Sequence, residues 1–205
     1  FYFITPPDPG LTPEQREEYL QGYSIPVLSN VSVHEVFPGH FVQLMLMRSL
    51  PGLSTVRRLS QTSSNVEGWA HYCETMMLDE GFGGDDPKLR LGQLIDALLR
   101  DARYIAGIKL HTQGMTIEQA TDFFVKEGHQ SPPIAQKEAL RGTSDPTYLY
   151  YALGKLEILK LRQDWQAKMG DKYSIGEFHK RLMEAGTVPI KIIRREMMGA
   201  DGPLL

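Results

Sequence analysis

The sequence is poor in cysteine, in long apolar runs and in net charge. Cys73 is the one cysteine among 205 residues, which excludes an internal disulfide framework but leaves the redox compartment open. No apolar run reaches the roughly eighteen residues that a membrane-spanning helix needs, and no signal peptide is present in these residues. The formal net charge of −3 gives no reason to expect binding to nucleic acid or an anionic membrane. We therefore expect a soluble globular protein whose compartment the sequence does not give.

The length and the helix signals predict one mainly α-helical domain. A chain of 205 residues can bury a substantial core, and it begins with Phe1 rather than Met, so we expect a processed product or a fragment. Thr12 and Gln15 form a capping box around Pro13, which favours a helix start there. Beyond a short lead-in over residues 1–10, no alternating pattern typical of strands occurs.

The remaining helices are predicted from caps and from 3.6-residue periodicity. We interpret residues 22–30 as a break, after which Ser29 or Asn30 caps a helix that reaches about residue 50. Residues 41–47 are apolar on nearly all sides, so we expect them to be deeply buried. The other predicted helices cover residues 65–78, 89–111, 116–126, 147–169 and 189–198, and one more begins at residue 174. A short helix is predicted within residues 54–64, and a loop over residues 129–133.

Two of these predicted helices show a regular arrangement of apolar or polar residues along one face. The helix at 65–78 combines an apolar face with a polar stripe of Glu67, His71 and Glu74. The long helix at 89–111 places a row of apolar residues in register: Leu91, Leu94, Ile95, Leu98, Leu99 and Ala102.

The segment from Val33 to Gln43 contains candidate metal ligands and a candidate general base. His34, Glu35 and His40 place two imidazoles and a carboxylate within seven residues. A zinc hydrolase needs these groups, because neutral imidazoles hold the metal and a nearby Glu accepts a proton from water. The alternative is a surface His-Glu pair followed by a Pro-Gly turn.

The spacing requires a distorted helix. Positions i and i+4 lie within roughly 40° of each other on a helix, whereas i+6 is nearly opposite. Pro38 cannot donate a hydrogen bond to the carbonyl of His34, and Gly39 tolerates unusual backbone angles. We therefore predict a bulge at Pro38-Gly39 that returns His40 to the face of His34.

Other polar residues are candidates to complete the site. Glu67 is the preferred third ligand, and His71 is the alternative, either as a ligand or as a residue that orients Glu67. Hydrolysis also needs a donor to the oxyanion. Tyr148, Tyr150, Tyr151 and His111 are candidates, while His129 and His179 have no polar company and are interpreted as structural or exposed.

Several motifs together resemble a known family. The segment from His34 to His40 with Gln43, followed by Glu67-Gly68-Trp69-Ala70, is similar to the bacterial family called domain of unknown function 885. The likeness continues through Gly107–His111, Tyr151–Gly154 and Phe178-His179, so it covers nearly the whole chain. Members are regarded as zinc-dependent peptidases related to the Glu-type zincins, and they are much longer.

The resemblance implies a specific site and architecture. It implies that His34, His40 and Glu67 hold one zinc ion, that Glu35 is the general base, and that Tyr151 or His111 lies near the oxyanion. Residues 1–205 would then be a single helical, zincin-like catalytic lobe from the C-terminal part of a longer protein, packed against an N-terminal region. The expected activity is peptide-bond hydrolysis. The alternatives are hydrolysis of a non-peptide amide, or a helical binding or scaffold lobe without catalysis.

Overall fold

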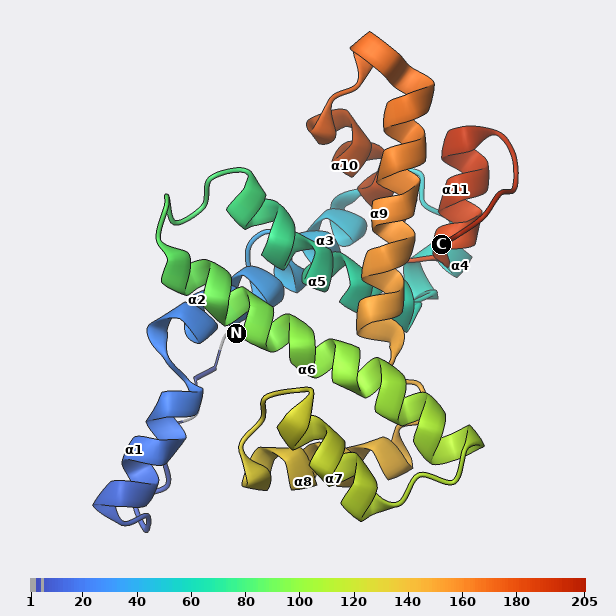
Figure 1. Cartoon of the computed structure of the whole chain (residues 1–205). Helices are drawn as coiled ribbons and strands as arrows, with labels where there is room; N and C mark the ends of the chain where they lie inside the picture. The colour runs from blue at the N-terminus through green and yellow to red at the C-terminus, as the bar shows by residue number, and fades with distance from the viewer. Residues whose placement is uncertain (1–2, 5) are drawn as a thin grey trace.

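The chain folds as helices throughout the part that the structure describes. The computed structural model describes residues 3–4 and 6–205, and in these ranges it contains α-helices, one short 3₁₀ helix and no strand (Figure 1). The predicted mainly α-helical fold is confirmed, whereas part of the predicted lead-in lies outside the described residues. The helices are α1 (Pro13–Gly22), α2 (Ile25–Glu35), α3 (His40–Ser49), α4 (Thr55–Leu59), α5 (Ser63–Asp79), α6 (Pro87–Thr112), α7 (Ile117–Lys126), α8 (Pro132–Ser144), α9 (Tyr150–Met169), η1 (Gly170–Lys172), α10 (Ile175–Glu184) and α11 (Ile190–Met198).

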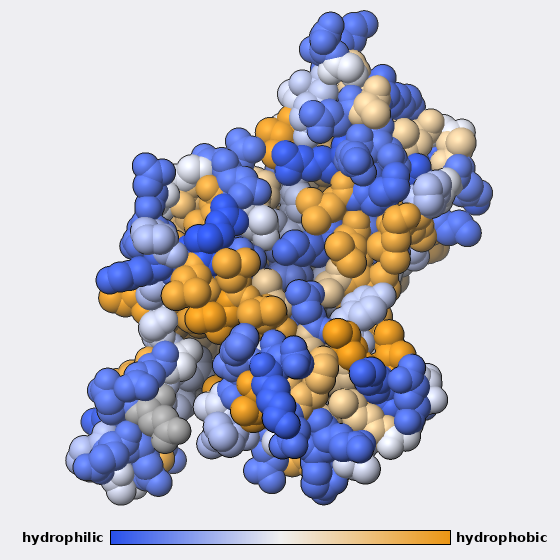
Figure 2. Space-filling view, in the orientation of Figure 1, coloured by the Kyte–Doolittle hydropathy of each residue, from blue (hydrophilic) through white to orange (hydrophobic). Residues whose placement is uncertain are grey.

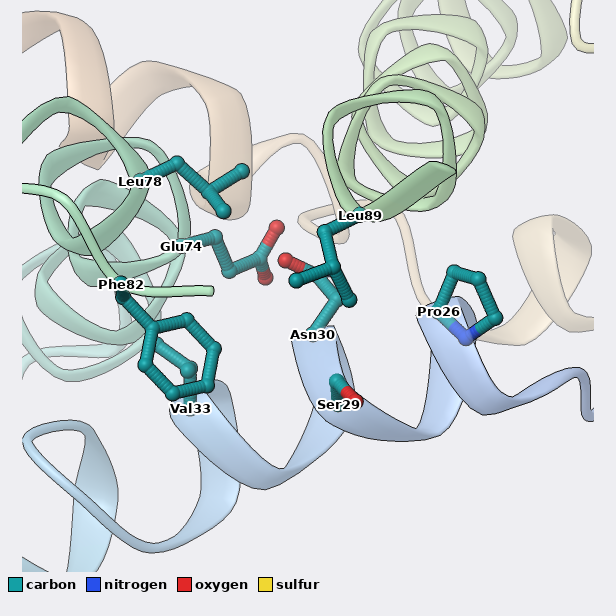
Figure 3. A pocket seen from close by; sticks show the side chains of 8 residues that line it. All are labelled: Pro26, Ser29, Asn30, Val33, Glu74, Leu78, Phe82 and Leu89. Carbon is teal, nitrogen blue, oxygen red and sulfur yellow. The ribbon is translucent and has the colours of Figure 1, made fainter. Parts of the chain in front are cut away.

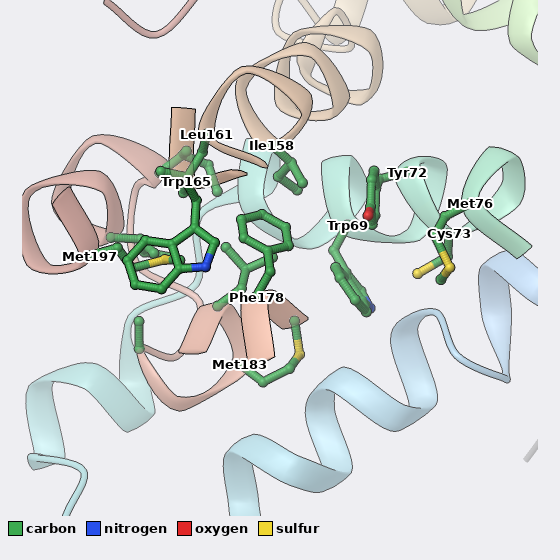
Figure 4. Packing of buried hydrophobic residues seen from close by; sticks show 14 of the residues in the cluster. Trp69, Tyr72, Cys73, Met76, Ile158, Leu161, Trp165, Phe178, Met183 and Met197 are labelled. Carbon is green, nitrogen blue, oxygen red and sulfur yellow. The ribbon is translucent and has the colours of Figure 1, made fainter. Parts of the chain in front are cut away.

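Helices α5 and α9 form the centre of the larger hydrophobic core. Trp69 and Tyr72 of α5 lie in one buried cluster with Ile158 and Trp165 of α9 and with Phe178 of α10 (Figure 4). The two central helices approach each other closely because glycines meet at their crossing. A Cβ on Gly68 would lie 2.4 Å from the carbonyl carbon of Gly154, and a Cβ on Gly154 would lie 1.7 Å from the carbonyl oxygen of Ser64.

A second, smaller core lies beneath α6, on the side of α7 and α8. Its buried members are mostly alanines, together with Phe124 of α7 and Tyr148 from the turn before α9. Figure 1 shows α6 as a long diagonal helix between the α7–α8 pair and the centre formed by α5 and α9. Helix α6 therefore connects the two cores.

The second helix begins earlier than the sequence suggested. We expected a break up to residue 30, but α2 begins at Ile25 after Ser24, and Pro26 lies in its first turn. Proline is well accepted there because the first N–H groups of a helix have no partner within the helix. The following α3 is also less buried than predicted: Phe41 and Met45 are about half exposed.

Two boundaries on the C-terminal side also differ. The expected loop over 129–133 contains the start of α8, a helix that the sequence analysis missed, and Pro132 lies in its first turn. Helix α9 begins at Tyr150 rather than at residue 147, because the residues after Pro146 form a turn. The helix at 189–198 is as expected, with Pro189 at its N-cap.

Most of the apolar row along α6 is exposed, although Ala102 is buried. Leu91, Leu94 and Leu98 are exposed, and Figure 2 shows apolar surface over the N-terminal half of this helix. The face turned inward instead carries small and polar residues, among them Gln93, Ala97, Arg100, Arg103 and Gly107. At 26 residues α6 is the length of a membrane span, but neither it nor another described helix is apolar enough to cross a bilayer.

Candidate metal centre

The helix that carries the His-Glu motif is interrupted between Glu35 and His40. Helix α2 ends at Glu35 and α3 begins at His40, so the interruption is larger than the predicted bulge: two helices joined by residues 36–39. The N–H of Gly39 donates to the carbonyl of Val33 at 3.0 Å. A Cβ on Gly39 would lie 1.8 Å from the carbonyl oxygen of His34, so this close approach requires glycine.

The interruption is held against α5. The peptide bond between Phe37 and Pro38 is cis, and the carbonyl of Pro38 accepts a hydrogen bond from the indole of Trp69 at 3.0 Å. Trp69 follows Glu67 by two residues on α5. The same contact therefore fixes the chain that carries His40 next to the helix that carries Glu67.

Three side chains from three helices converge here. The Nε2 atoms of His34 and His40 lie 3.4 and 3.3 Å from Oε2 of Glu67. One ligand atom from each residue falls within 4.8 Å of the others. Two ligands bound at about 2.0–2.1 Å to one tetrahedral zinc ion lie roughly 3.3–3.4 Å apart. The spacing of the two imidazole–carboxylate pairs therefore fits one small cation.

The Glu67 carboxylate has the charge and the free lone pairs of a ligand. Its Oε2 atom is buried and makes no hydrogen bond within the described residues, because neither imidazole reaches it with hydrogen-bond geometry. Burial by itself would raise the pKa of Glu67, but His34 and His40 outweigh it and lower this pKa to about 2. Glu67 is therefore ionised at neutral pH.

The far side of His34 is bound by a second carboxylate. Its Nδ1–H donates to Oε1 of Glu74 at 2.7 Å, and both side chains are nearly inaccessible. In the neutral imidazole this leaves a lone pair on Nε2, which faces the carboxylate of Glu67. Two acceptors in contact repel each other unless a cation or a proton lies between them. Metal-binding histidines commonly have such a carboxylate partner, so the residues present fit a zinc ion.

Glu74 is in turn held by α5 and α6. It accepts hydrogen bonds from Nδ1–H of His71 at 3.1 Å, and the guanidinium of Arg100 lies 3.0 Å away. Burial lowers the pKa of His71 to about 4, so this imidazole is neutral at pH 7. His71, the alternative third ligand, thus contacts Glu74 instead of joining the other three. The role of Glu74 was missed, although the polar stripe on α5 pointed toward it.

Behind this network the packing of the helices leaves little space. A cavity of about 10 Å³ lies between α2, α5 and α6, bordered by Asn30, Val33 and Glu74 (Figure 3). This is roughly the space of one water molecule. On the other side, 17% of the His40 side chain and 23% of the Glu67 side chain remain exposed. The three converging side chains are therefore accessible from the side of His40 and Glu67.

The tyrosines at the start of α9 have different surroundings in the fold. Tyr148 is fully buried in the smaller core, and the hydroxyl of Tyr150 donates to Asp145 at 3.4 Å. The ring of Tyr151 lies 6.3 Å from the ring of His34. Tyr151 is the oxyanion-donor candidate that the structure places beside the three converging side chains.

Glu35 and His111 take different positions. Glu35 is the last residue of α2, next to His34, and its side chain is exposed. Within the described ranges no hydrogen bond or ion pair occupies its carboxylate, so it is free to accept a proton. His111 lies at the end of α6, where Nε2–H donates to the carbonyl of Gly142 in α8 at 2.8 Å.

His179 does have a polar hydrogen-bond partner, contrary to the interpretation from the sequence. Arg162 donates to the hydroxyl of Tyr72 at 3.0 Å, and this hydroxyl donates to Nε2 of His179 at 2.9 Å. Burial lowers the pKa of His179 to about 4, so its ring stays neutral and can accept. The contact joins α5, α9 and α10 beside Trp69.

Comparisons with known proteins place this chain in a family. The model of the family described as "Bacterial protein of unknown function (DUF885)" matches residues 2–197. The chain belongs to this family. A "putative lipoprotein of unknown function" from Shewanella oneidensis is 33% identical with a TM-score of 0.88, over 97% of this chain and 36% of that one. A "putative lipoprotein" from Colwellia psychrerythraea is 30% identical with a TM-score of 0.83, over 87% and 31%.

The DUF885 chain spans about a third of the length of these two structures. A comparison with curated proteins gave no match. The family and the fold are therefore shown, and the chemistry has to be argued from the site.

Proposed function

We propose that this DUF885 chain is the catalytic part of a metal-dependent hydrolase that cleaves peptide bonds. Zinc would be held by His34, His40 and Glu67. The observation that supports this most strongly is the buried Oε2 of Glu67, which makes no hydrogen bond in the described structure and faces both imidazole Nε2 atoms at 3.3–3.4 Å. While both imidazoles are neutral, no positive charge in the described structure offsets this carboxylate, and an uncompensated buried charge costs several kcal/mol.

The residues around the three ligands supply the other groups that hydrolysis needs. A bound zinc ion acts as a Lewis acid, which makes water a nucleophile at neutral pH and stabilises negative charge on a carbonyl oxygen. The carboxylate of Glu35 would accept the proton of the attacking water and pass it to the leaving amine. The hydroxyl of Tyr151 would donate to the oxyanion. Three protein ligands leave a coordination position for substrate or water.

Metal content and activity of matched variants test the proposal. Glu35→Gln should retain the metal but lower peptide hydrolysis by about 10²–10⁴-fold, because an amide cannot accept the proton. His34→Ala should lose both metal and activity. Glu80→Gln is the matched control, since this exposed glutamate directly follows α5 and should change neither property. The measurements are elemental analysis after dialysis and cleavage of a peptide library read by mass spectrometry.

Each alternative gives a different result. A protein without stoichiometric metal would be a binding or scaffold lobe. Stoichiometric metal with hydrolysis of simple amides, but of no peptide in the library, would mean a non-peptide amidase. Loss of metal in Glu35→Gln would make Glu35 a ligand and remove it as the base.

A further inference from the structure

Three arginines surround the ring of Tyr151. The guanidinium carbons of Arg100, Arg103 and Arg141 lie 5.8, 5.3 and 6.0 Å from the ring centroid. Arg100 and Arg103 come from α6, and Arg141 comes from α8. Only a guanidinium whose hydrogen bonds are not already taken by a carboxylate could bind an anionic part of a substrate.

Two of the three are committed to buried carboxylates. Arg103 makes two hydrogen bonds to Glu138, at 2.7 and 2.8 Å, and Arg100 holds Glu74 at 3.0 Å. Both side chains are about 10% exposed. Their guanidinium groups are therefore structural and are not available to a ligand.

Arg141 is bound differently. Its side chain is 37% exposed, and its Nη2 contacts Asp145 only at 3.4 Å and the hydroxyl of Tyr151 at 3.5 Å. The Asp145 contact is an i,i+4 pair of partly exposed groups, which contributes little to stability. The ring of Tyr148 lies 5.8 Å from the guanidinium carbon, so two aromatic rings fix its position. Arg141 is therefore held in place while its hydrogen-bonding capacity is weakly used.

We infer that Arg141 binds the C-terminal carboxylate of a peptide substrate, so that the enzyme cleaves near a free C-terminus. This inference rests on the proposed function. Guanidinium binds carboxylate with two parallel hydrogen bonds, a geometry that lysine cannot reproduce. The ring of Tyr151 lies 6.3 Å from the His34 ring and 6.0 Å from the guanidinium carbon of Arg141, so His34 and Arg141 are no farther apart than the sum of these two distances. Up to about four extended residues, at about 3.3–3.6 Å each, cover such a separation.

The test compares matched peptides that end in a free carboxylate or in an amide. In the metal-loaded protein, Arg141→Gln should raise KM for the free acids about 10- to 100-fold, as expected for a lost charge-assisted bond. It should leave KM for the amides unchanged, and Arg141→Lys should restore only part of the loss. Tyr151→Phe should instead lower kcat for both series. Thermal unfolding of each variant shows whether it is folded.

A control arginine is available on α10. Arg181 also pairs with a carboxylate at i,i+4, Glu177, and its guanidinium carbon lies 5.4 Å from the ring of Trp165. Arg181→Gln therefore removes the same kind of contacts as Arg141→Gln without touching the proposed subsite. It should not alter the preference for free acids.

A binding experiment separates failure of the subsite from failure of the catalytic proposal. Calorimetry with an N-acetyl dipeptide acid and its amide should show tighter binding of the acid, lost in Arg141→Gln. Acid-selective binding without peptide cleavage would keep the subsite and reject the peptidase. Equal cleavage of acids and amides, or an equal fall in kcat for both series in Arg141→Gln, would overturn the subsite. The latter result would assign Arg141 to the support of Tyr151.

Discussion

Helices α5 and α6 pack against each other and both bury charged side chains, but α5 also buries large apolar side chains, whereas α6 exposes several of its own. Helix α5 buries a charged stripe: His71 and Glu74 are each 1% exposed. Helix α6 exposes its leucines, with Leu91 at 58% and Leu94 at 48%, and turns Arg100 inward. Hydropathy alone would have left the charged stripe of α5 exposed and turned the leucines of α6 inward.

The difference has an electrostatic cause on the inner side. Arg100 of α6 approaches Glu74 of α5 at 3.0 Å, so each helix neutralises the charge that the other buries. Asp96, one turn before Arg100, accepts a hydrogen bond from Asn30 of α2 at 2.7 Å. A buried charge is tolerated only when it is paired in this way. The polar face of α6 is therefore directed inward by the carboxylate that orients His34.

The outer side of α6 has a different explanation. The two similar solved structures are about three times as long as the matched region. Contiguous exposed apolar surface commonly marks an interaction site. We propose that in longer family members this face of α6 contacts a part of the protein outside the matched region.

Replacing Glu74 should have the largest effect on stability. Glu74→Gln keeps the shape of the side chain but leaves Arg100 without its buried counter-charge. Removing one partner of such a pair typically costs about 3–5 kcal/mol. The variant should also bind metal about 10- to 100-fold more weakly, since His34 loses its carboxylate partner. Urea unfolding and a metal titration measure the two effects.

Leu94→Gln is the matched control on α6. In this chain it should change the free energy of unfolding by no more than about 0.5 kcal/mol, because Leu94 is half exposed. In a longer family member the equivalent change should cost more if the proposed contact exists. Equal effects of Glu74→Gln and Leu94→Gln in this chain would remove the contrast between the two helices.

Substituting the glycine of α5 that contacts α9 should lower the stability of the fold by an intermediate amount. Gly68→Ala would place a methyl group 2.4 Å from the backbone of Gly154, so α5 and α9 must separate. Overpacking of this kind costs about 1–3 kcal/mol. Gly176→Ala in α10 is the control: its new Cβ meets nothing within 4 Å, and alanine favours a helix over glycine by about 0.5–1 kcal/mol. If Gly68→Ala and Gly176→Ala lowered the free energy of unfolding by similar amounts, close packing at Gly68 would not be the cause of the loss.

The buried histidine on α5 predicts that the stability of the fold depends on pH. The folded-state pKa of His71 is about 4, below its usual 6.5, because burial disfavours the charged form. Between these values the unfolded chain binds the proton and the folded chain does not, so stability falls as pH decreases from 6.5 to 4. The slope reaches about 1.4 kcal/mol per pH unit. His71→Gln should reduce the slope in urea unfolding of metal-free protein; an unchanged slope would exclude His71.

Much of the local structure could be predicted from the sequence. The capping box at Thr12 and Gln15 and the one opening α7 at Thr116 are present as expected, because caps depend on residues within one turn. The interruption at Pro38-Gly39 was predicted because a six-residue spacing cannot bring two imidazoles together on a regular helix. Helix α8 was missed, because the prolines at its start were interpreted as part of a loop.

What only the tertiary structure decided is which side of each helix faces inward and which polar groups meet. His34, Glu67 and Glu74 are distant in sequence, and the packing of α2 on α5 brings them together. The inward face of α6 depends on Arg100 finding Glu74 there, which no periodicity encodes. Propensity and capping act within a few residues, whereas pairing of buried charges is settled only when helices pack. The sequence by itself therefore determined most of the helices and the candidate ligands, and the fold determined their partners.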